Sequence, residues 1–433
     1  MKLMTVLLTA GAVLAAAPAP AAAQTATGAA APVASPAELE RARRILRAAP
    51  LVDGHNDLPW AVRDDFGGKL SRVDITRDTR GLTPPLQTDI PRLRQGGVGA
   101  QFWSVYVPAT FTGPAGPKAV LEQVDIARRI VARNPEAFAM ASTADEVVRI
   151  HRSGRIASMM GAEGGYAIDN SLPILRQLHA AGVGYMTLTH SKTIDWADSA
   201  TDAPRHGGLS RFGEEVVREM NRLGMLVDLS HVSAETMRDA MRVSEAPVIF
   251  SHSSAYGVTA HPRNVPDDVL AALKTDGGVV MITFVGGFVS EAVRAWGASR
   301  AAEEARLKAL HPGDPERVVR ELASWTSASA APRATVADVA DHVEHVRRVA
   351  GVDHVGLGGD FDGTSNLPVG LEGVEGYPLL AAELLRRGWS ERDIRKLAGE
   401  NILRVMRAAE RTAARLQRER APSEATIAEL DGG

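Results

Sequence analysis

The chain has 433 residues, of which 45% are hydrophobic and 23% are charged, and its formal net charge is -3. This length accommodates one large domain or two ordinary ones, with enough apolar side chains for a substantial core. No basic stripe is visible, which argues against a nucleic-acid partner. Cysteine is absent, so disulfides are excluded and any metal site must use His, Asp and Glu.

The first residues have the pattern of a secretory signal. Lys2 gives a positive start, residues 4–17 are apolar, and the small residues 21–23 resemble a cleavage site. We therefore predict a signal peptide over residues 1–23 and a flexible leader over residues 24–35. The expected location is periplasmic or secreted, without a membrane anchor in the mature form. An N-terminal anchor helix is the less favoured alternative, because the apolar stretch is short for a membrane span.

From residue 36 onward one pattern recurs, in which a short apolar run ends in a polar residue and an amphipathic helical stretch follows. Continuous apolar strands that alternate with helices indicate a parallel sheet covered by helices. Eight runs are the number that closes a parallel barrel. The sequence therefore predicts an α/β protein, a (β/α)8 TIM barrel, as a single domain over residues 36–420. The runs are PLVDGHND, GVGAQFWSVY, RIASMMGAEGG, GVGYMTLTH, MLVDLSH, APVIFSH, GGVVMITF and HVGLGGDFD.

An open doubly wound sheet is the alternative, since it shares the alternation of strands and helices. Polar residues end many strands around the chain, however, whereas a doubly wound fold concentrates its site at one switch point, so the barrel is favoured. A helical insertion is expected over residues 289–333, after the seventh predicted strand, either as a lid or wall near the catalytic face or as a surface hairpin. A helical extension follows Ser390, and residues 421–433 are predicted to form a C-terminal tail.

Metal-binding side chains are predicted at the strand ends. His55 and Asp57 are two residues apart, so on a strand both side chains point to the same side. At the end of a barrel strand they would face the mouth and supply half a metal site. Alone this pair is a weak signal, because a single His at a strand end is more often a hydrogen-bonded structural residue. Five more runs also end in such residues, namely Glu163, His190, His231, His252 and Asp360.

Burying these groups unpaired would cost several kcal/mol each, and a shared cation offsets that cost. Of these four histidines and three carboxylates, three histidines and two carboxylates already exceed the needs of one tetrahedral zinc with an open position. The set therefore suggests two ions roughly 3.5–4 Å apart, bridged by Glu163 from a middle strand. Such ions would share a water whose pKa is lowered to about 7, so that it is available as hydroxide at neutral pH. This predicts hydrolysis of an amide or a related acyl bond.

The remaining histidines and aromatic residues receive less specific predictions. Asp53 and Asp228 precede strand-end histidines and are expected to orient an imidazole. An aromatic cluster is expected to pack or to line the substrate pocket, namely Phe102, Trp103 and Tyr106. Two histidines lie in loops that are candidates for the cleft, His206 and His261. Four histidines on helical stretches are expected to be surface or packing residues, namely His151, His179, His342 and His345.

The motifs of these runs resemble the membrane dipeptidase (renal dipeptidase) family of zinc peptidases. The resemblance extends from about Leu51 to about Arg407. It implies a TIM barrel related to the amidohydrolases, two Zn²⁺ per chain and hydrolysis of small dipeptides with a free C-terminal carboxylate. The family often accepts a D-residue at the C-terminal side, some members open β-lactam rings, and a homodimer is implied. The motifs are HNDLPW, GAQFWSVY, AEGG, TLTH, DLSHVS, APVIFSHSSAY, RNVPDDVL and GGDFDG.

The resemblance also implies roles for individual residues of the metal site. His55 and Asp57 would bind the first zinc. Glu163 would bridge both ions. His231 and His252 would complete the second site. All five positions hold the residue types that the family requires.

Three further roles follow from the same resemblance. His190 would stabilise the developing oxyanion beside the scissile carbonyl. Arg263 would pair with the substrate's C-terminal carboxylate, which suits a guanidinium fork. Asp360 would take a proton from the bridging water and pass it to the leaving amine.

The sequence departs from the animal members of the family. Residues 284–290, FVGGFVS, replace a Tyr-rich stretch that helps line the animal pocket, so Phe288 is expected near the substrate. The cysteines and the GPI signal of the animal members are absent, so covalent dimerisation and membrane attachment are not carried over. Two alternatives stay open: another binuclear hydrolase of the same barrel class, such as a deacylase or lactonase, and a non-catalytic periplasmic binding protein. Arg263 and the intact ligand set favour the dipeptidase.

Overall fold

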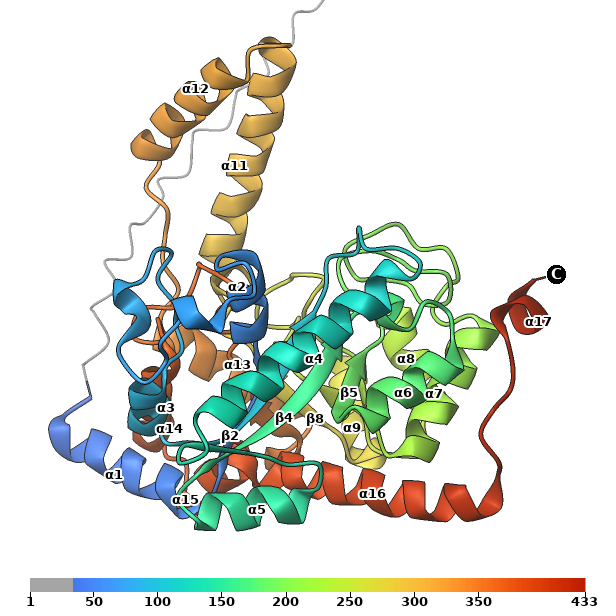
Figure 1. The fold of residues 1–433 in the computed structure, drawn as a ribbon. Helices are drawn as coiled ribbons and strands as arrows, with labels where there is room; N and C mark the ends of the chain where they lie inside the picture. Colours follow the sequence, from blue (N-terminus) through green and yellow to red (C-terminus); the bar gives the residue numbers. More distant parts are fainter. Residues whose placement is uncertain (1–33, 433) are drawn as a thin grey trace, which may run out of the picture. The chain divides into compact units, whose positions relative to one another are not determined.

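A closed barrel of eight parallel strands forms the centre of the molecule (Figure 1). The computed structural model describes residues 34–432, so the predicted signal peptide and nearly all of the leader lie outside the described residues. Each barrel strand pairs with the next along the chain, and β9 pairs with β1 to close the ring. The predicted TIM barrel is confirmed. Its strands are β1 (Leu51–Asn56), β2 (Val98–Tyr106), β4 (Ile156–Glu163), β5 (Val183–Thr187), β6 (Leu226–Asp228), β7 (Ile249–Phe250), β8 (Val279–Ile282) and β9 (Val355–Leu357).

One short strand was not expected from the sequence. β3 (Phe138–Met140) lies outside the ring and pairs in parallel with the first residues of β4. Its three residues show no clear alternation of apolar and polar side chains, which is the usual signal of a strand. β4 therefore has three neighbours, β2, β3 and β5.

Helices cover the outside of the barrel, and local sequence signals define their ends. Ser171, Ser210 and Ser233 each accept a hydrogen bond from a backbone N–H of the helix that follows. Gly224 and Gly277 end two helices with φ of 83° and 86°, a conformation that glycine adopts without strain. The outer helices are α1 (Pro36–Ala48), α2 (Leu58–Asp64), α3 (Ile90–Gly96), α4 (Ala115–Arg133), α5 (Ala144–Arg152), α6 (Leu172–Ala180), α7 (Arg211–Leu223), α8 (Ala234–Val243), α9 (Asp267–Asp276), α13 (Val336–Val349) and α14 (Tyr377–Arg386).

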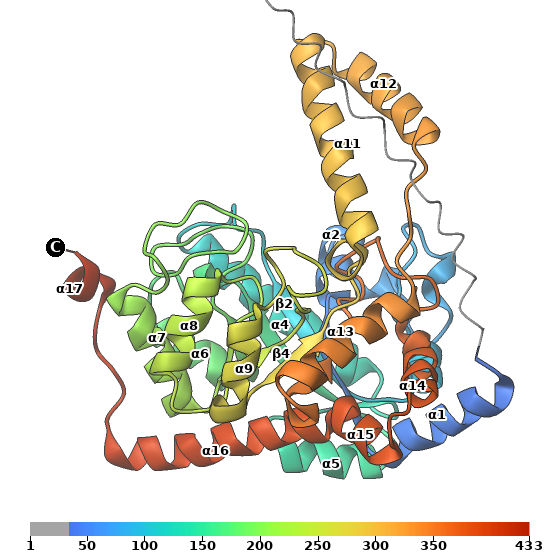
Figure 2. The ribbon, with the colours of Figure 1, turned by 180° about the vertical axis from the view of Figure 1, so that it is seen from behind.

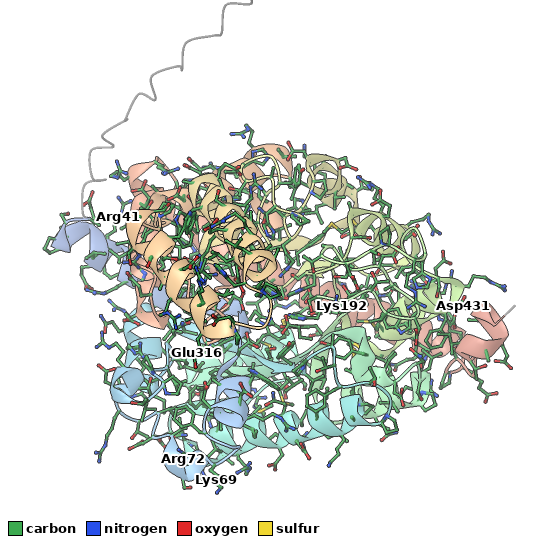
Figure 3. All side chains as sticks on the ribbon, turned by 90° about the horizontal axis from the view of Figure 1, so that it is seen from above. Arg41, Lys69, Arg72, Lys192, Glu316 and Asp431 are labelled. Carbon is green, nitrogen blue, oxygen red and sulfur yellow. The ribbon has the colours of Figure 1, made fainter. Side chains whose placement is uncertain are left out.

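The predicted insertion forms a helical hairpin that projects from the barrel (Figures 1 and 2). The short helix α10 (Gly286–Val289) precedes it, and α11 (Glu291–Leu310) and α12 (Pro315–Ala328) form its two arms. A small apolar cluster holds the arms together, consisting of Leu307, Val318 and Leu322. Seen from above, Glu316 marks the hairpin and Lys192 marks the loop that follows β5 (Figure 3).

The C-terminal extension runs along the opposite end of the barrel (Figures 1 and 2). α15 (Glu391–Arg395) continues through a π-helical turn into α16 (Asn401–Glu419), so one interrupted helical segment is present. A last helix, α17 (Ile427–Asp431), docks on α7, where the Asp431 carboxylate accepts a 2.6 Å hydrogen bond from the Ser210 hydroxyl. No helix within residues 34–432 is long and apolar enough to cross a membrane.

Candidate active site

A cavity of about 430 Å³ opens where the barrel strands end. The last residues of the strands and the turns that follow them deliver polar side chains to this cavity, as expected for a parallel barrel. His55 is fully buried beside them, with its Nε2 3.2 Å from Oδ2 of Asp57. The other eight side chains predicted for the site all line the cavity, namely Asp57, Glu163, His190, His231, His252, Arg263, Phe288 and Asp360.

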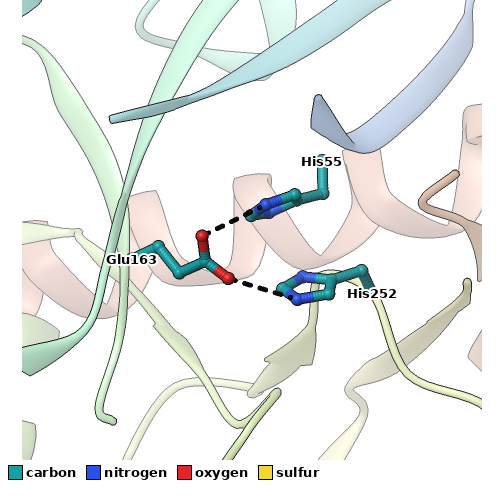
Figure 4. A group of neighbouring side chains, drawn as sticks. All are labelled: His55, Glu163 and His252. Atoms are coloured by element: carbon teal, nitrogen blue, oxygen red, sulfur yellow. Dashed lines mark ion pairs between the residues drawn. The ribbon is translucent and has the colours of Figure 1, made fainter. Parts of the chain in front are cut away.

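Glu163, the last residue of β4, lies between the histidines. Its Oε2 is 3.4 Å from Nε2 of His55, and its Oε1 is 3.4 Å from Nε2 of His252 (Figure 4). The same Oε1 lies 3.0 Å from Nε2 of His231. The carboxylate thus offers one oxygen to His55 and the other to His231 and His252, which is the arrangement that a bridging ligand needs.

The ligand atoms form three overlapping groups, in each of which they lie within 4.8 Å of one another. All five residues predicted as metal ligands occur in these groups. His190 and Asp360 occur there too, so both lie close enough to contact a bound ion or its ligands. The groups are His55 with Glu163 and His252, Glu163 with His190 and His231, and His55 with Asp57 and Asp360.

These residues fit a divalent metal site. Nε2 of His55 and Oδ1 of Asp57 are buried and have no hydrogen-bond partner among the described residues. Burial lowers the pKa of His231 and of His252 well below the usual value, so both imidazoles are neutral and each offers a lone pair. Neutral imidazole and carboxylate are ligands of zinc and of similar divalent ions. A bound cation would also offset the cost of burying these carboxylates.

Two hydroxyl groups fix the orientation of two imidazoles of these groups. The Tyr185 hydroxyl donates to the carbonyl of Gly54 at 3.1 Å, so at 2.9 Å it accepts from Nδ1–H of His55. The Ser251 hydroxyl donates to Asp228 at 2.6 Å and accepts from Nδ1–H of His252 at 2.8 Å. Nε2 of each ring is therefore turned toward the other ligand atoms, where it can bind a metal when the ring is neutral.

The aspartates expected to orient imidazoles act differently. Asp228 reaches His252 only through Ser251. Asp53 accepts hydrogen bonds from the backbone N–H groups of His55 and Gly359, at 3.2 and 2.9 Å, and thereby ties β1 to the turn after β9. Sequence reasoning missed Tyr185, which lies on another strand and has no local signal. Ser251 does have a local sequence signal, because the pair Ser-His occurs in both DLSH and IFSH.

Two site residues have an uncommon backbone conformation. His231 has a φ of 68° and Asp360 a φ of 62°, in the left-handed region that is unfavourable for side chains with a Cβ. Such conformations persist where surrounding contacts enforce them, and they are frequent at functional sites. Burial, aided by the carboxylates of Asp57 and Glu163, raises the pKa of Asp360 well above its usual value.

Arg263 supplies the positive charge of the cavity wall. Its side chain is buried, and no carboxylate of residues 34–432 lies within ion-pair distance of it. Its hydrogen bonds, to the Ser253 hydroxyl and the His252 carbonyl, are long at 3.4 and 3.3 Å, and its Nε has no partner among the described residues. Burial lowers its pKa to about 10, which leaves it charged at neutral pH. The Phe288 ring covers the guanidinium at 5.3 Å.

Aromatic side chains form another part of the cavity wall. Tyr106 packs against Trp60 with ring centres 5.0 Å apart and against His190 at 4.7 Å. Of the predicted aromatic cluster, only Tyr106 lines the cavity, while Phe102 and Trp103 are buried in the core. Of the loop histidines, His261 stacks on Phe288 at 4.3 Å, whereas His206 contacts the carbonyl of Ile194. The hairpin contributes no side chain to the cavity.

Comparisons with known proteins show the family to which the chain belongs. The chain matches the family described as membrane dipeptidase (peptidase family M19) over residues 39–420. It is 41% identical to dipeptidase verJ of Clonostachys rogersoniana over 390 residues, which cover 88% of this chain and 89% of that protein.

Two solved structures are similar as well. One is the dipeptidase AC, a metallopeptidase, with 26% identity, a TM-score of 0.66, and coverage of 83% of this chain and 98% of the other. The second is a metallopeptidase from Rhodobacter sphaeroides liganded with a phosphinate mimic of L-Ala-D-Ala, with 26% identity, a TM-score of 0.65, and coverage of 83% and 99%. The chain therefore belongs to the membrane dipeptidase family, peptidase family M19, and is a metallo-dipeptidase of the hydrolase class.

Proposed function

We propose that this enzyme is an exported dipeptidase that uses two Zn²⁺ to hydrolyse dipeptides with a free C-terminal carboxylate, including dipeptides with a D-residue at that end. The observation that carries the proposal is the presence in one cavity of the ligand groups around Glu163 and of the buried, unpaired Arg263. Residues 36–420 form the catalytic domain in this proposal, residues 1–23 direct export, and the active form is a homodimer.

The metal ligands are assigned by which oxygen of Glu163 they face. His55 and Asp57 would hold one ion together with Glu163, whose Oε2 is 3.4 Å from Nε2 of His55. His231 and His252 would hold the other ion together with Glu163, whose Oε1 is 3.0 and 3.4 Å from their Nε2 atoms. When bound, the two ions supply a water whose pKa is lowered to about 7 and a Lewis acid for the substrate carbonyl.

Asp360 is the group that moves the proton. Its raised pKa, caused first by burial, favours accepting a proton from the attacking water. It then donates that proton to the nitrogen of the leaving amine. Its carboxylate lies within 4.8 Å of ligand atoms of His55 and Asp57, beside the place proposed for the first ion and its water.

His190 stabilises the oxygen of the attacked carbonyl. Burial lowers its pKa, so the ring is neutral and carries one N–H donor. A donor already aimed at the position of a developing oxyanion lowers the barrier without reorganising in the reaction. Tyr106 packs against the ring and limits its rotation.

Arg263 selects substrates with a terminal carboxylate. A buried guanidinium with no carboxylate partner among the described residues gains most from a ligand that neutralises it, and a carboxylate fits its two parallel N–H groups. Phe288 covers the guanidinium and contacts the C-terminal side chain of the dipeptide. The phosphinate mimic of L-Ala-D-Ala in the Rhodobacter sphaeroides relative supports the choice of an L,D dipeptide. Opening of β-lactam rings is a secondary activity in this proposal.

Amino-acid release tests the proposal. Purified enzyme is assayed with matched L,L and L,D dipeptides before chelation, after chelation and after return of Zn²⁺. The expected result is cleavage that chelation abolishes and about two equivalents of zinc restore. If zinc-loaded enzyme cleaves no dipeptide but hydrolyses other amides or lactones, the substrate assignment is wrong and the deacylase or lactonase alternative replaces it.

A further inference from the structure

The turn that carries Asp360 is held in an unfavourable backbone conformation. Asp360 and Asp362 both have a φ of 62°, and neither is a glycine. The turn also lines the cavity through Asp362, Gly363 and Thr364. A Cβ at Gly363 would lie 2.3 Å from Oδ2 of Asp57 and 2.5 Å from Oδ1 of Asp360. A small shift of this turn would therefore displace Asp360 relative to the metal ligands.

Gln87 forms hydrogen bonds with this turn from a loop that is distant in the sequence, since 275 residues separate Gln87 from Asp362. Its backbone N–H donates to Oδ1 of Asp362 at 2.7 Å, and its side-chain oxygen accepts from the backbone N–H of Asp362 at 2.7 Å. Its side-chain NH₂ donates to the carbonyl of Thr364 at 2.6 Å. Both ends of one amide side chain thus bind the backbone on either side of Gly363.

The loop that presents Gln87 is itself firmly anchored. Thr88 accepts a 2.8 Å hydrogen bond from the Asn56 side chain, between His55 and Asp57. Asp89 forms a buried ion pair with Arg92, with 2.6 Å between Oδ2 and Nε. The carbonyl of Gln87 accepts from the N–H of Val374 at 3.2 Å. Gln87 is therefore a fixed support that connects the metal-binding end of β1 with the turn after β9.

We propose that Gln87 is a positioning residue for Asp360, holding the turn of residues 360–364 in the geometry in which the Asp360 carboxylate can transfer the proton. Gln87 does not line the cavity, so it acts through the turn. The inference rests on the proposed function only for the role given to Asp360. That Gln87 holds the turn is a separate claim with a readout of its own.

The expected kinetic effect lies in turnover. Gln87→Ala removes both side-chain bonds, and Gln87→Glu keeps the shape but places a carboxylate oxygen against the Thr364 carbonyl and beside Asp362. Misplacement of a catalytic group by about 1 Å lowers rates by up to about 100-fold. We expect both variants to lower kcat about 10- to 100-fold, with KM changed less than threefold and zinc content unchanged. Gln177→Ala, on the exposed face of α6, is the matched control.

A double-mutant comparison separates positioning from general damage. If Gln87 acts through Asp360, adding Gln87→Ala to Asp360→Asn lowers kcat by less than twofold, because the group that it positions is already disabled. A full additional loss in the Asp360→Asn background overturns the proposal. So does a kcat for Gln87→Ala that equals that of the Gln177→Ala control.

Hydrogen exchange supplies a readout that does not require activity. The amide of Asp362 is bonded to Gln87, so peptides that cover residues 359–366 are expected to exchange at least tenfold faster in Gln87→Ala, with the barrel strands unchanged. Unchanged exchange in these peptides overturns the proposal even if kcat falls. If the wild-type enzyme hydrolyses no dipeptide, the proposed function fails, whereas this measurement still decides whether Gln87 holds the turn.

Discussion

The Nε2 atoms of His231 and His252 face each other at 2.9 Å, beside Oε1 of Glu163. Nδ1–H of His252 is donated to Ser251, so its Nε2 is a lone pair when the ring is neutral. A cation that binds both nitrogens would stabilise two neutral imidazoles at this distance. We therefore expect metal binding to contribute to the stability of the folded enzyme.

Chelation is expected to destabilise the folded enzyme, and zinc to restore it. Free zinc at 100 times its dissociation constant stabilises a single-site protein by about 3 kcal/mol. Thermal unfolding with and without chelator measures the shift. Glu163→Gln, which weakens both sites, is expected to lose most of the response to zinc. An equal zinc response in Glu163→Gln and in wild type would falsify the assignment of Glu163 as the bridge.

Asp360→Asn is expected to retain zinc while kcat falls at least 100-fold, since general acid–base groups contribute about 100- to 10,000-fold. Asn has nearly the same shape but cannot accept the proton. Metal analysis and steady-state kinetics on one preparation check both parts. Near-normal turnover in this variant means that another group transfers the proton.

Arg263→Ala is expected to lower kcat/KM for free dipeptides about 100-fold, because a desolvated charge pair with the substrate carboxylate is lost. Dipeptide amides lack that carboxylate and serve as matched substrates whose kcat/KM changes much less. Arg263→Lys, which keeps the charge without the planar fork, is expected to be intermediate. Equal losses for free dipeptides and amides would show that the arginine supports the cavity rather than the carboxylate.

Ser251→Ala is expected to lower zinc affinity about 10- to 100-fold, as is usual when the partner of a metal-binding imidazole is removed. The change leaves Asp228 without the hydroxyl through which it orients His252. Competition with a chromophoric chelator measures the affinity. Ser153→Ala, at the exposed C-terminal end of α5, is the control and is expected to match wild type.

His342 is expected to make stability depend on pH. Its Nδ1 accepts from the N–H of Ala255 at 3.0 Å, and burial lowers its pKa to about 4 from 6.5. Between these two pKa values the imidazole binds a proton in the unfolded chain but not in the folded chain. The contribution of His342 to the free energy of unfolding therefore rises with pH from about 4 to 6.5 and is constant above. The full span corresponds to about 3 kcal/mol.

Comparison with His342→Asn isolates this contribution. Asn can still accept from Ala255 but does not titrate. Urea unfolding at pH 7.5 and pH 5 is expected to show the stability advantage of wild type over the variant shrinking by about 2 kcal/mol at the lower pH. An advantage that is the same at both values rules out His342 as the titrating group.

The strand pattern and the strand-end residues predicted most of the barrel and the site. The sequence predicts four residues of the ligand groups, because a parallel barrel brings the ends of distant strands together. Residues that end separate strands in the sequence therefore lie close together in the structure, namely His55, Glu163, His231 and His252. Tyr185 and Gln87 were not found, because they act through contacts that depend on strand register and on an irregular loop. The sequence does not decide whether the hairpin covers the cavity or projects from the barrel, since a helical pattern alone does not say what a helix packs against.

Glu163 stands on the most firmly embedded strand of the ring, since β4 pairs with β2, β3 and β5. Phe288, in contrast, lies on the four-residue helix α10, which directly precedes the first helix of the inserted hairpin. The ligand groups around Glu163 and the part of the cavity wall formed by Phe288 are thus carried by separate pieces of chain. If the proposed function holds, replacing α10 and the hairpin is expected to change the contact with the dipeptide side chain without displacing the ligand groups around Glu163.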